Sequence, residues 1–267
     1  MIRFFINSNI WVAFCVLGLA SSSEIILQTS NAQISQFLFF ATIFTYNFQR
    51  VIRISKGNNH ARKNWLIKNS SPVYLLMLFS FLMSVYYFFY FQLITQKVIF
   101  FTAIVSLLYP FGIRKIPFAK IFVISFVWCI STMLLLVLEN NILISQNILL
   151  HLSSRILFVF AITIPFDIRD LKHDCGHVAT IPIFFGIDKA KGIAIFSLFL
   201  CVILGFFQLV QNEISISIFL ALILLYFLAY VSIKKSNKNK SEMYFSFWVE
   251  SLSIFSYLFL IILLLIF

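Results

Sequence analysis

Long apolar runs follow one another along almost the whole chain, and each is about as long as a membrane-spanning helix. A helix needs about 20 apolar residues to cross a bilayer, and it satisfies its own backbone hydrogen bonds there. The runs lack the alternation of apolar and polar residues that is typical of transmembrane barrels. We therefore expect an all-α polytopic membrane protein with about nine spans, at 4–28, 33–54, 72–94, 97–113, 118–138, 142–166, 190–211, 214–233 and 245–267.

The basic residues fall on one set of connections. All but two of the 20 Lys and Arg residues lie at the N-terminus or beside a connection that follows an even-numbered span, and the exceptions are Lys97 and Arg155. Because cytoplasmic loops are enriched in Lys and Arg, we expect these connections and the N-terminus in the cytoplasm and the C-terminus outside an inner (cell) membrane. Arg3 and the apolar run after it also imitate a signal peptide, but loss of that span would break the charge pattern.

Composition changes this picture little. The chain is 61% hydrophobic, its mean hydropathy is +1.00 and its net charge is +11. The charge is explained by the cytoplasmic loops, so a nucleic-acid partner is not expected. No Pro-, Gly- or Ser-rich linker divides the chain, which predicts one transmembrane helical domain over 1–267. The two longest connections, about 55–71 and 167–189, lie four spans apart, which suggests two four-helix halves, a ninth helix and a shared pocket under both loops.

Acidic residues gather in one of these loops, in the stretch "PFDIRDLKHDCGHVATIPIFFG" at 165–186. The spacing of Asp167, Asp170 and Asp174 places three carboxylates on one face of a helix that continues from span six. Their repulsion requires a counter-charge, either from Arg169 and Lys172 or from a bound cation. Three carboxylates suit Mg²⁺, which keeps several waters and commonly bridges to phosphates. The alternative is a loop helix that merely carries surface charge.

Zinc is a weaker interpretation of the same stretch. His173, Asp174, Cys175 and His177 lie together in "HDCGH", but the spacing between Cys and His is short and there is no second Cys/His pair. The four cysteines are scattered and predict no disulfide framework.

The stretch resembles the second aspartate-rich motif of the UbiA-type intramembrane prenyltransferases, in which the aspartates are followed by Gly, Thr, Pro and Gly, here Gly176, Thr180, Pro182 and Gly186. The segment "LLYPFGIRKIPFAKIFV" at 107–123 is similar to the family's Tyr-Pro stretch, supplied here by Tyr109, Pro110, Arg114 and Lys115. The resemblance implies a UbiA-like bundle that binds an isoprenoid diphosphate at its cytoplasmic mouth. Basic side chains and Mg²⁺ would hold the diphosphate, and an aromatic tunnel would hold the isoprenoid tail. Asp167, Asp170 and Asp174 would be the metal-binding and catalytic residues.

The first aspartate motif of that family is missing. The corresponding stretch, "TYNFQRVIRISKG" at 45–57, keeps Asn47, but the chain has no Asp or Glu between Glu24 and Glu139. Arg50 and Arg53 stand there instead. A guanidinium group binds two phosphate oxygens at once, so Arg50 and Arg53 could replace one metal ion. The alternative is that they are topology signals, as basic residues at a helix end often are. The expected diphosphate-binding set is Asn47, Arg50, Arg53, Tyr109, Arg114, Lys115, Arg169 and Lys172.

Two functions stay open on this basis. One is a prenyltransferase that acts on an isoprenoid diphosphate or a related lipid. The other is a catalytically inactive relative that binds a lipid or a protein partner, and a secondary transporter is a distant third.

Overall fold

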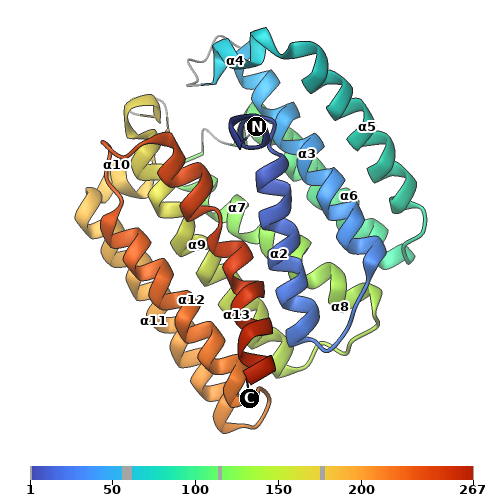
Figure 1. Ribbon diagram of the computed structural model, residues 1–267, viewed down its shortest axis with the longest axis vertical. Helices are drawn as coiled ribbons and strands as arrows, with labels where there is room; N and C mark the ends of the chain where they lie inside the picture. Colours follow the sequence, from blue (N-terminus) through green and yellow to red (C-terminus); the bar gives the residue numbers. More distant parts are fainter. Residues whose placement is uncertain (1, 56–61, 114–115, 175–177, 267) are drawn as a thin grey trace.

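The structure is a computed structural model that describes residues 2–55, 62–113, 116–174 and 178–266 (Figure 1). Every regular element in these ranges is helical. In chain order the elements are α1 (Ile2–Asn7), α2 (Ile10–Ile26), α3 (Ala32–Ser55), α4 (Lys63–Lys68), α5 (Ser70–Phe88), α6 (Leu93–Leu108), η1 (Tyr109–Phe111), α7 (Ala119–Cys129), η3 (Ile130–Leu134), α8 (Leu135–Glu139), α9 (Gln146–Asp174), α10 (Ile181–Phe185), α11 (Ile187–Val210), α12 (Ile216–Lys235), η4 (Tyr244–Val249) and α13 (Leu252–Ile266).

The prediction of an all-α membrane protein is confirmed. Within the described ranges, 7 helical segments are long and apolar enough to cross a membrane: Ser70–Phe88, Leu93–Phe111, Ala119–Glu139, Gln146–Leu171, Ile187–Val210, Ile216–Lys235 and Tyr244–Ile266. Helix α2 is apolar but has only 17 residues, and α3 has 24 residues but carries polar side chains such as Gln33 and Gln36. The count of about nine spans therefore stays a prediction for α2 and α3.

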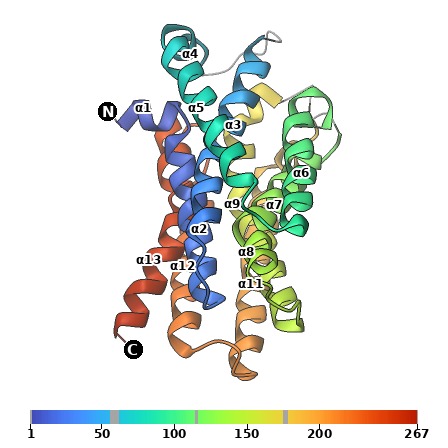
Figure 2. The same ribbon diagram turned by 90° about the vertical axis from the view of Figure 1, so that its right-hand side faces the viewer.

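The first predicted span, 4–28, is not one helix. It breaks at Asn9, whose backbone has φ 61°, a left-handed conformation that Asn tolerates better than most residues. The side chain of Asn47 on α3 holds this break. Its amide nitrogen donates to the carbonyls of Ser8, at 2.7 Å, and Ile43, at 2.9 Å, and its oxygen accepts from the Asn9 amide at 2.9 Å. Helix α1 consequently turns away from the axis of α2 (Figure 2).

Most of the long helices run roughly along one direction, so the molecule has two ends (Figure 1). The N-terminus, α4 and α10 lie at one end, and the C-terminus lies at the other. Helix α4 belongs to the connection 55–71 and α10 to the connection 167–189. The described parts of the two longest basic loops therefore share one end, while the side of the membrane that this end faces stays a prediction.

Helix α9 passes through the middle of the bundle and contributes fully buried residues such as Ala161, Ile164 and Ile168 to the core. It continues beyond the predicted span 142–166 as far as Asp174. The prediction that the aspartates lie on a helix continuing from span six is therefore confirmed for the backbone of Asp167, Asp170 and Asp174.

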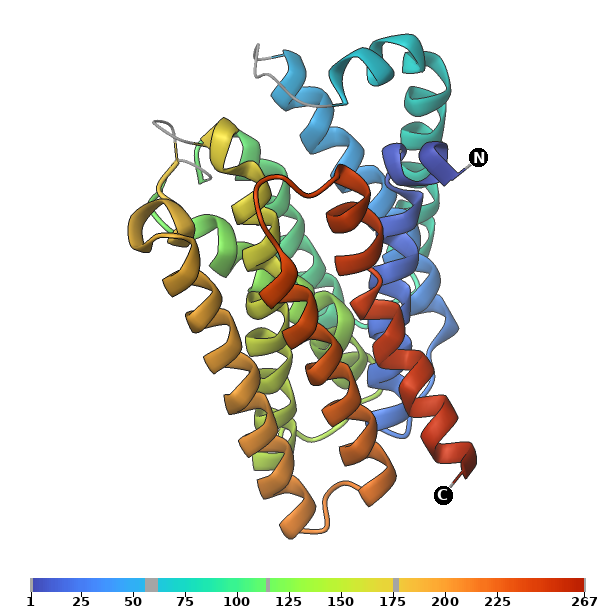
Figure 3. The same cartoon turned by 60° about the vertical axis from the view of Figure 1, so that its left-hand side comes forward.

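The ninth predicted span begins with a π-helical turn, η4, and α13 follows it between α12 and α2 (Figure 3). The approach to α2 is close, because a Cβ added to Gly18 would lie 3.0 Å from the Cα of Ile254. A π-turn holds more residues than an α-turn and changes which side chains face inward, and such turns are frequent at functional sites. Here it turns Ser246 and Glu250 toward α3 and α9, where both line one cavity.

Candidate functional site

A cavity of about 250 Å³, called the main cavity below, lies between α2, α3, α7, α9 and η4. Its charged lining consists of Arg50, Arg53, Arg62, Lys120, Arg169, Asp170, Glu242 and Glu250. Five of these side chains are basic and three are acidic, so the lining carries an excess of positive charge when all are ionised. Arg62 immediately precedes α4, which places the charged part at the α4 end of the molecule.

The rest of the lining is mostly apolar and aromatic. The apolar and aromatic residues are Val12, Tyr46, Tyr109, Val123, Ile124, Val127, Trp128, Val159, Ile162 and Phe166. Seven hydroxyl and amide side chains complete the lining: Asn9, Thr45, Gln49, Ser106, Thr163, Ser246 and Ser253. The Trp128 indole donates to the Tyr46 hydroxyl at 2.9 Å, which fixes both rings. A second cavity of about 100 Å³ adjoins this part and shares five lining residues with it: Thr45, Tyr46, Ser106, Val127 and Trp128. The charged part of the main cavity is called the mouth below, and the apolar and aromatic part is called the chamber. A cationic mouth beside an apolar chamber suits a molecule with an anionic head and an apolar tail.

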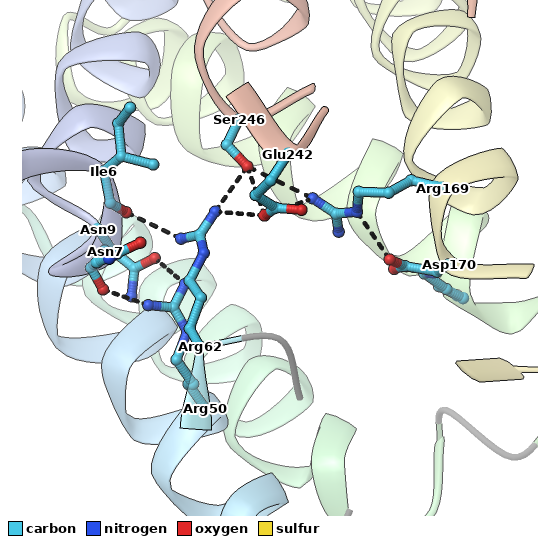
Figure 4. Close-up of polar contacts among 10 residues, drawn as sticks. Ile6, Asn7, Asn9, Arg50, Arg62, Arg169, Asp170, Glu242 and Ser246 are labelled. Carbon is cyan, nitrogen blue, oxygen red and sulfur yellow. Dashed lines mark hydrogen bonds and ion pairs between the residues drawn. The ribbon is translucent and has the colours of Figure 1, made fainter. Parts of the chain in front are cut away.

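A chain of ion pairs crosses the mouth (Figure 4). The Glu242 carboxylate accepts from Arg62 at 2.7 Å and from Arg169 at 3.3 Å. Ser246 joins the chain, since its hydroxyl lies 2.8 Å from Glu242 and 2.6 Å from Arg62. Partial burial raises the pKa of Glu242, but the positive charges of Arg169 and Arg62 outweigh it and hold this pKa below its ordinary value. One carboxylate thus sits between two guanidinium groups.

Asp167 and Asp170 on α9 are also paired. Arg169 donates to Asp170 at 2.8 Å, and the Lys120 ammonium lies 2.7 Å from Asp167 and 3.3 Å from Asp170. Asp167 is 1% exposed and Lys120 is 7% exposed. The predicted repulsion between the carboxylates is therefore relieved by Arg169, as expected, and also by Lys120, whose place beside a basic connection predicts only a topology signal.

Arg50 and Asn47 have structural partners. The Arg50 guanidinium donates to the carbonyl of Asn7 and to the side chain of Asn9, so it clamps the break between α1 and α2 (Figure 4). Asn47 is buried beneath it in the hydrogen bonds described above. Arg50 nevertheless lines the main cavity, as does Arg53, so both arginines face the interior in the way that favours a phosphate site over a purely topological role.

The structure thus brings part of the predicted site together. Arg50, Arg53, Tyr109, Arg169 and Asp170 line the main cavity, and Asp167 lies just behind its wall, against Lys120. Asn47 belongs to the neighbouring packing. Arg114 and Lys115 lie outside the described residues, and so do the side chains of Lys172 and Asp174.

Magnesium was expected on the three aspartates. Among the residues that the structure describes, no group of three His, Cys, Asp or Glu side chains is placed to hold a metal. Asp167 and Asp170 do converge on one cationic position, where the Lys120 ammonium lies. Carboxylate oxygens are suitable donors for Mg²⁺, so the two residues fit the ion chemically, although Lys120 competes for the same oxygens.

Five residues of the site had no place in the predicted set: Arg62, Lys120, Glu242, Ser246 and Glu250. A signal for the last three exists in the sequence, because they recur every four residues, as one helical face, in an otherwise apolar segment. An ionisable residue such as Glu250 inside an apolar span is a functional candidate by default. Arg62 and Lys120 carry no comparable signal, since basic loop residues are expected in any case.

The comparisons with known proteins agree with this geometry at the level of the fold. No family model matches the chain, and no curated protein is significantly similar to it in sequence. Among solved structures, a UbiA homologue from Aeropyrum pernix K1 has a TM-score of 0.71 and 11% identity, covering 94% of this chain and 98% of that one.

Two further structures are similar. A UbiA homologue from Archaeoglobus fulgidus, solved with GPP and Mg²⁺, has a TM-score of 0.67 and 13% identity and covers 99% of both chains. A structure described as digeranylgeranylglyceryl phosphate synthase has a TM-score of 0.62 and 13% identity and covers 98% of both chains. The resemblance to the UbiA superfamily is therefore confirmed in the fold, which is that of UbiA prenyltransferase homologues over nearly the whole length.

Proposed function

We propose that the protein transfers a prenyl group from an isoprenoid diphosphate to an acceptor within the membrane. The observation that carries the proposal is the main cavity, in which five basic side chains surround a mouth that continues into an apolar, aromatic chamber. The UbiA homologues with the same fold have been solved with GPP or DMAPP and Mg²⁺. Both ligands combine an anionic head with an apolar tail, which is the shape and polarity of this cavity.

Donor binding begins at the ion pairs of the mouth. Glu242 holds the position between Arg62 and Arg169 that a diphosphate would occupy, because an anion is what two facing guanidinium groups bind best. The donor displaces Glu242 from its contacts with these groups, and the Glu242 side chain, which is 40% exposed, turns toward solvent. Arg53 and Arg50 complete the cationic wall on α3.

Transfer then requires cleavage of the bond between the prenyl carbon and the diphosphate oxygen. Negative charge grows on the leaving oxygens, and guanidinium groups already in place stabilise it without reorganisation. Mg²⁺, when bound with the diphosphate, adds positive charge at the same oxygens, and Asp167 and Asp170 are the described residues that would hold it. Tyr46 and Trp128 line the chamber, where their rings stabilise positive charge on the prenyl group and exclude water.

A second function is supported by a different observation. Asp167 and Asp170 are neutralised by Lys120 and Arg169, and the described part of α3 supplies no carboxylate to the cavity. A protein of this kind could hold a lipid diphosphate without cleaving it. Binding without release of diphosphate is the result that distinguishes this alternative from a transferase.

The proposed location follows from the basic loops. The cavity mouth shares the α4 end of the molecule with the described Lys- and Arg-rich connections, and such loops are retained in the cytoplasm. The mouth therefore faces the cytoplasm in the proposed arrangement, with the N-terminus on that side and the C-terminus across the membrane.

The proposal is tested by direct binding of geranyl diphosphate to purified protein in detergent with Mg²⁺. Arg169→Gln is the informative variant, because Arg50 also clamps the α1–α2 break and its loss would disturb folding. Losing a charge-assisted contact costs about 1.5–3 kcal/mol, so the affinity should fall roughly tenfold to a hundredfold. Arg169→Lys should recover part of it, since a point charge cannot reproduce the fork.

Lys97→Gln is the matched control. It removes the same charge from an exposed position at the start of α6, away from the main cavity. Equal affinities for the wild-type protein, Arg169→Gln and Lys97→Gln would refute a phosphate site at the mouth.

A further inference from the structure

Glu250 differs from the other carboxylates of the main cavity. Glu242 and Asp170 are held by arginine at 2.7–3.3 Å, whereas no ion pair or side-chain hydrogen bond reaches Glu250 from the residues that the structure describes. It lies one residue beyond η4, inside the segment Tyr244–Ile266 that is apolar enough to span a membrane. A carboxylate without partners is costly in such surroundings, and proteins retain one there chiefly when it has a task.

Ser253 lies beside Glu250, and its side chain also has no hydrogen-bond partner among the described residues. The two residues are three apart on one helical face, and both line the main cavity. Ser253 is fully buried, and its hydroxyl has no hydrogen-bond partner. Buried hydroxyls are normally satisfied, so the Ser253 hydroxyl is an exception, and the half-buried Glu250 beside it lines the cavity without a side-chain partner. Together they indicate a ligand that supplies the missing bonds.

The surroundings show which part of a ligand this wall would meet. Arg169, Arg62, Glu242 and Arg50 form the charged part of the same cavity, and Tyr46 lines it from α3. The diphosphate is held by the arginines, so a negative group would not occupy the wall as well. The wall suits a neutral, polar group that donates a proton.

We propose that Glu250 and Ser253 form the acceptor-binding wall of the cavity, and that Glu250 takes up the proton that the acceptor loses during transfer. This inference rests on the proposed transferase function. The acceptor is then a molecule with a removable proton on its nucleophilic atom, of the class of alcohols, phenols and amines.

The step balances without any further reactant. The bond between the prenyl carbon and the diphosphate oxygen breaks, and its electron pair leaves with the diphosphate. A lone pair of the acceptor forms the new bond to the prenyl carbon. The proton of the acceptor passes to a carboxylate oxygen of Glu250, which later releases it to solvent. The Ser253 hydroxyl, covered in the ligand-free protein, turns toward the acceptor and orients it.

The test separates donor binding from transfer. Native membranes that contain the protein supply the acceptor, radiolabelled geranyl diphosphate is the donor, and the labelled lipid product is counted. Binding of the same donor is measured on purified protein. Glu250→Gln keeps the size of the side chain but cannot take up a proton, so it should bind the donor at least as well as the wild type and form at least a hundredfold less product. Ser253→Ala should lower product formation about two- to tenfold.

Two further variants exclude a merely structural effect. Glu250→Asp keeps a carboxylate base, so it should retain part of the wild-type activity and the wild-type dependence of the rate on pH. Glu250→Gln should lose that pH dependence. Glu213→Gln, at an exposed position in the connection before α12, makes the same chemical change outside the cavity and should leave product formation unchanged.

The outcomes distinguish the two proposals. Normal product formation by Glu250→Gln, or a pH profile like that of the wild type, would overturn the acceptor wall and leave the transferase proposal standing. A wild-type protein that binds no geranyl diphosphate would refute the proposed function, and one that binds it but forms no labelled product would refute transfer. In either case no acceptor would lose a proton, so Glu250 would have no role as a base.

Discussion

The ion pair between Lys120 and Asp167 gives a sharp test of how the α9 aspartates are used. Its atoms lie 2.7 Å apart, and both side chains are almost completely shielded, at 8% and 1% exposure. The perturbation is Lys120→Met, which keeps the length of the side chain and removes its charge. Asp170 retains its contact with Arg169 at 2.8 Å, so the change leaves Asp167 with the larger loss.

The expected magnitude follows from burial. Removing one partner of a buried pair leaves the other charge poorly compensated and typically costs about 3–5 kcal/mol. The variant should therefore unfold in detergent at a clearly lower apparent Tm than the wild type. Lys120→Met/Asp167→Asn removes both charges and should recover part of the loss, whereas Lys97→Met on the exposed start of α6 should change little.

Magnesium provides the decisive comparison, because Asp167 and Asp170 converge on the position that the Lys120 ammonium holds. In Lys120→Met this position is open to another cation. Mg²⁺ at a hundred times its Kd would raise stability by about 2.7 kcal/mol, so Mg²⁺ should restore much of the lost Tm. The wild type should respond weakly to Mg²⁺ alone and strongly once geranyl diphosphate supplies further oxygen ligands.

The assay is differential scanning fluorimetry with and without Mg²⁺, with Ca²⁺ for comparison. A Lys120→Met variant as stable as the wild type would mean that the buried pair contributes nothing. A destabilised variant that no concentration of Mg²⁺ stabilises would show that the two aspartates are counter-ions of Lys120 and not cation ligands.

Two further predictions concern the mouth and the topology. Because the pKa of Glu242 is lowered in the folded protein, its contribution to stability is present above its ordinary pKa of about 4.3 and is lost as the pH falls through the lower folded value. The Tm difference between the wild type and Glu242→Gln should thus be constant near neutral pH and shrink below about pH 4.3; a difference that persists unchanged in acid would contradict the ion-pair chain. For topology, in a variant without Cys175, an impermeant thiol reagent added to intact cells should label a cysteine placed at Asn141 and miss one at Asn237. Labelling at Asn237 would invert the proposed orientation.

The fold could be predicted from the sequence because bilayer-length apolar runs leave few alternatives. The helical continuation through Asp167, Asp170 and Asp174 could be predicted too, since carboxylates at that spacing share a helical face. The break at Asn9 could not. It depends on the Asn47 side chain from another helix, which satisfies the carbonyl of Ser8. Local sequence in an apolar segment carries no sign of such a distant partner.

The charged site was harder to predict, because a basic residue in a membrane protein has two explanations that look alike in sequence. Arg62 and Lys120 were assigned to topology, yet both are less than a tenth exposed and hold carboxylates. Glu242 and Glu250 lie outside both aspartate motifs, which belong to the second and sixth spans, so the resemblance gives no reason to expect them in the site. Glu242 just before the ninth span and Glu250 within it reach the same cavity because η4 contacts α9 and α13 packs against α2.

The charge balance of the main cavity explains how a pocket without the first aspartate motif is held together. Five basic side chains around about 250 Å³ would repel one another strongly if the cavity were empty of anions. Asp167, Asp170 and Glu242 neutralise Lys120, Arg169 and Arg62 in that state. The same pairing opposes ligand binding, because a diphosphate must displace Glu242 before it reaches the arginines. The free energy of donor binding is therefore the difference between two sets of charge-assisted contacts. Weak binding of inorganic phosphate and much tighter binding of a prenyl diphosphate follow from this, because only the latter adds burial of an apolar chain to the exchange.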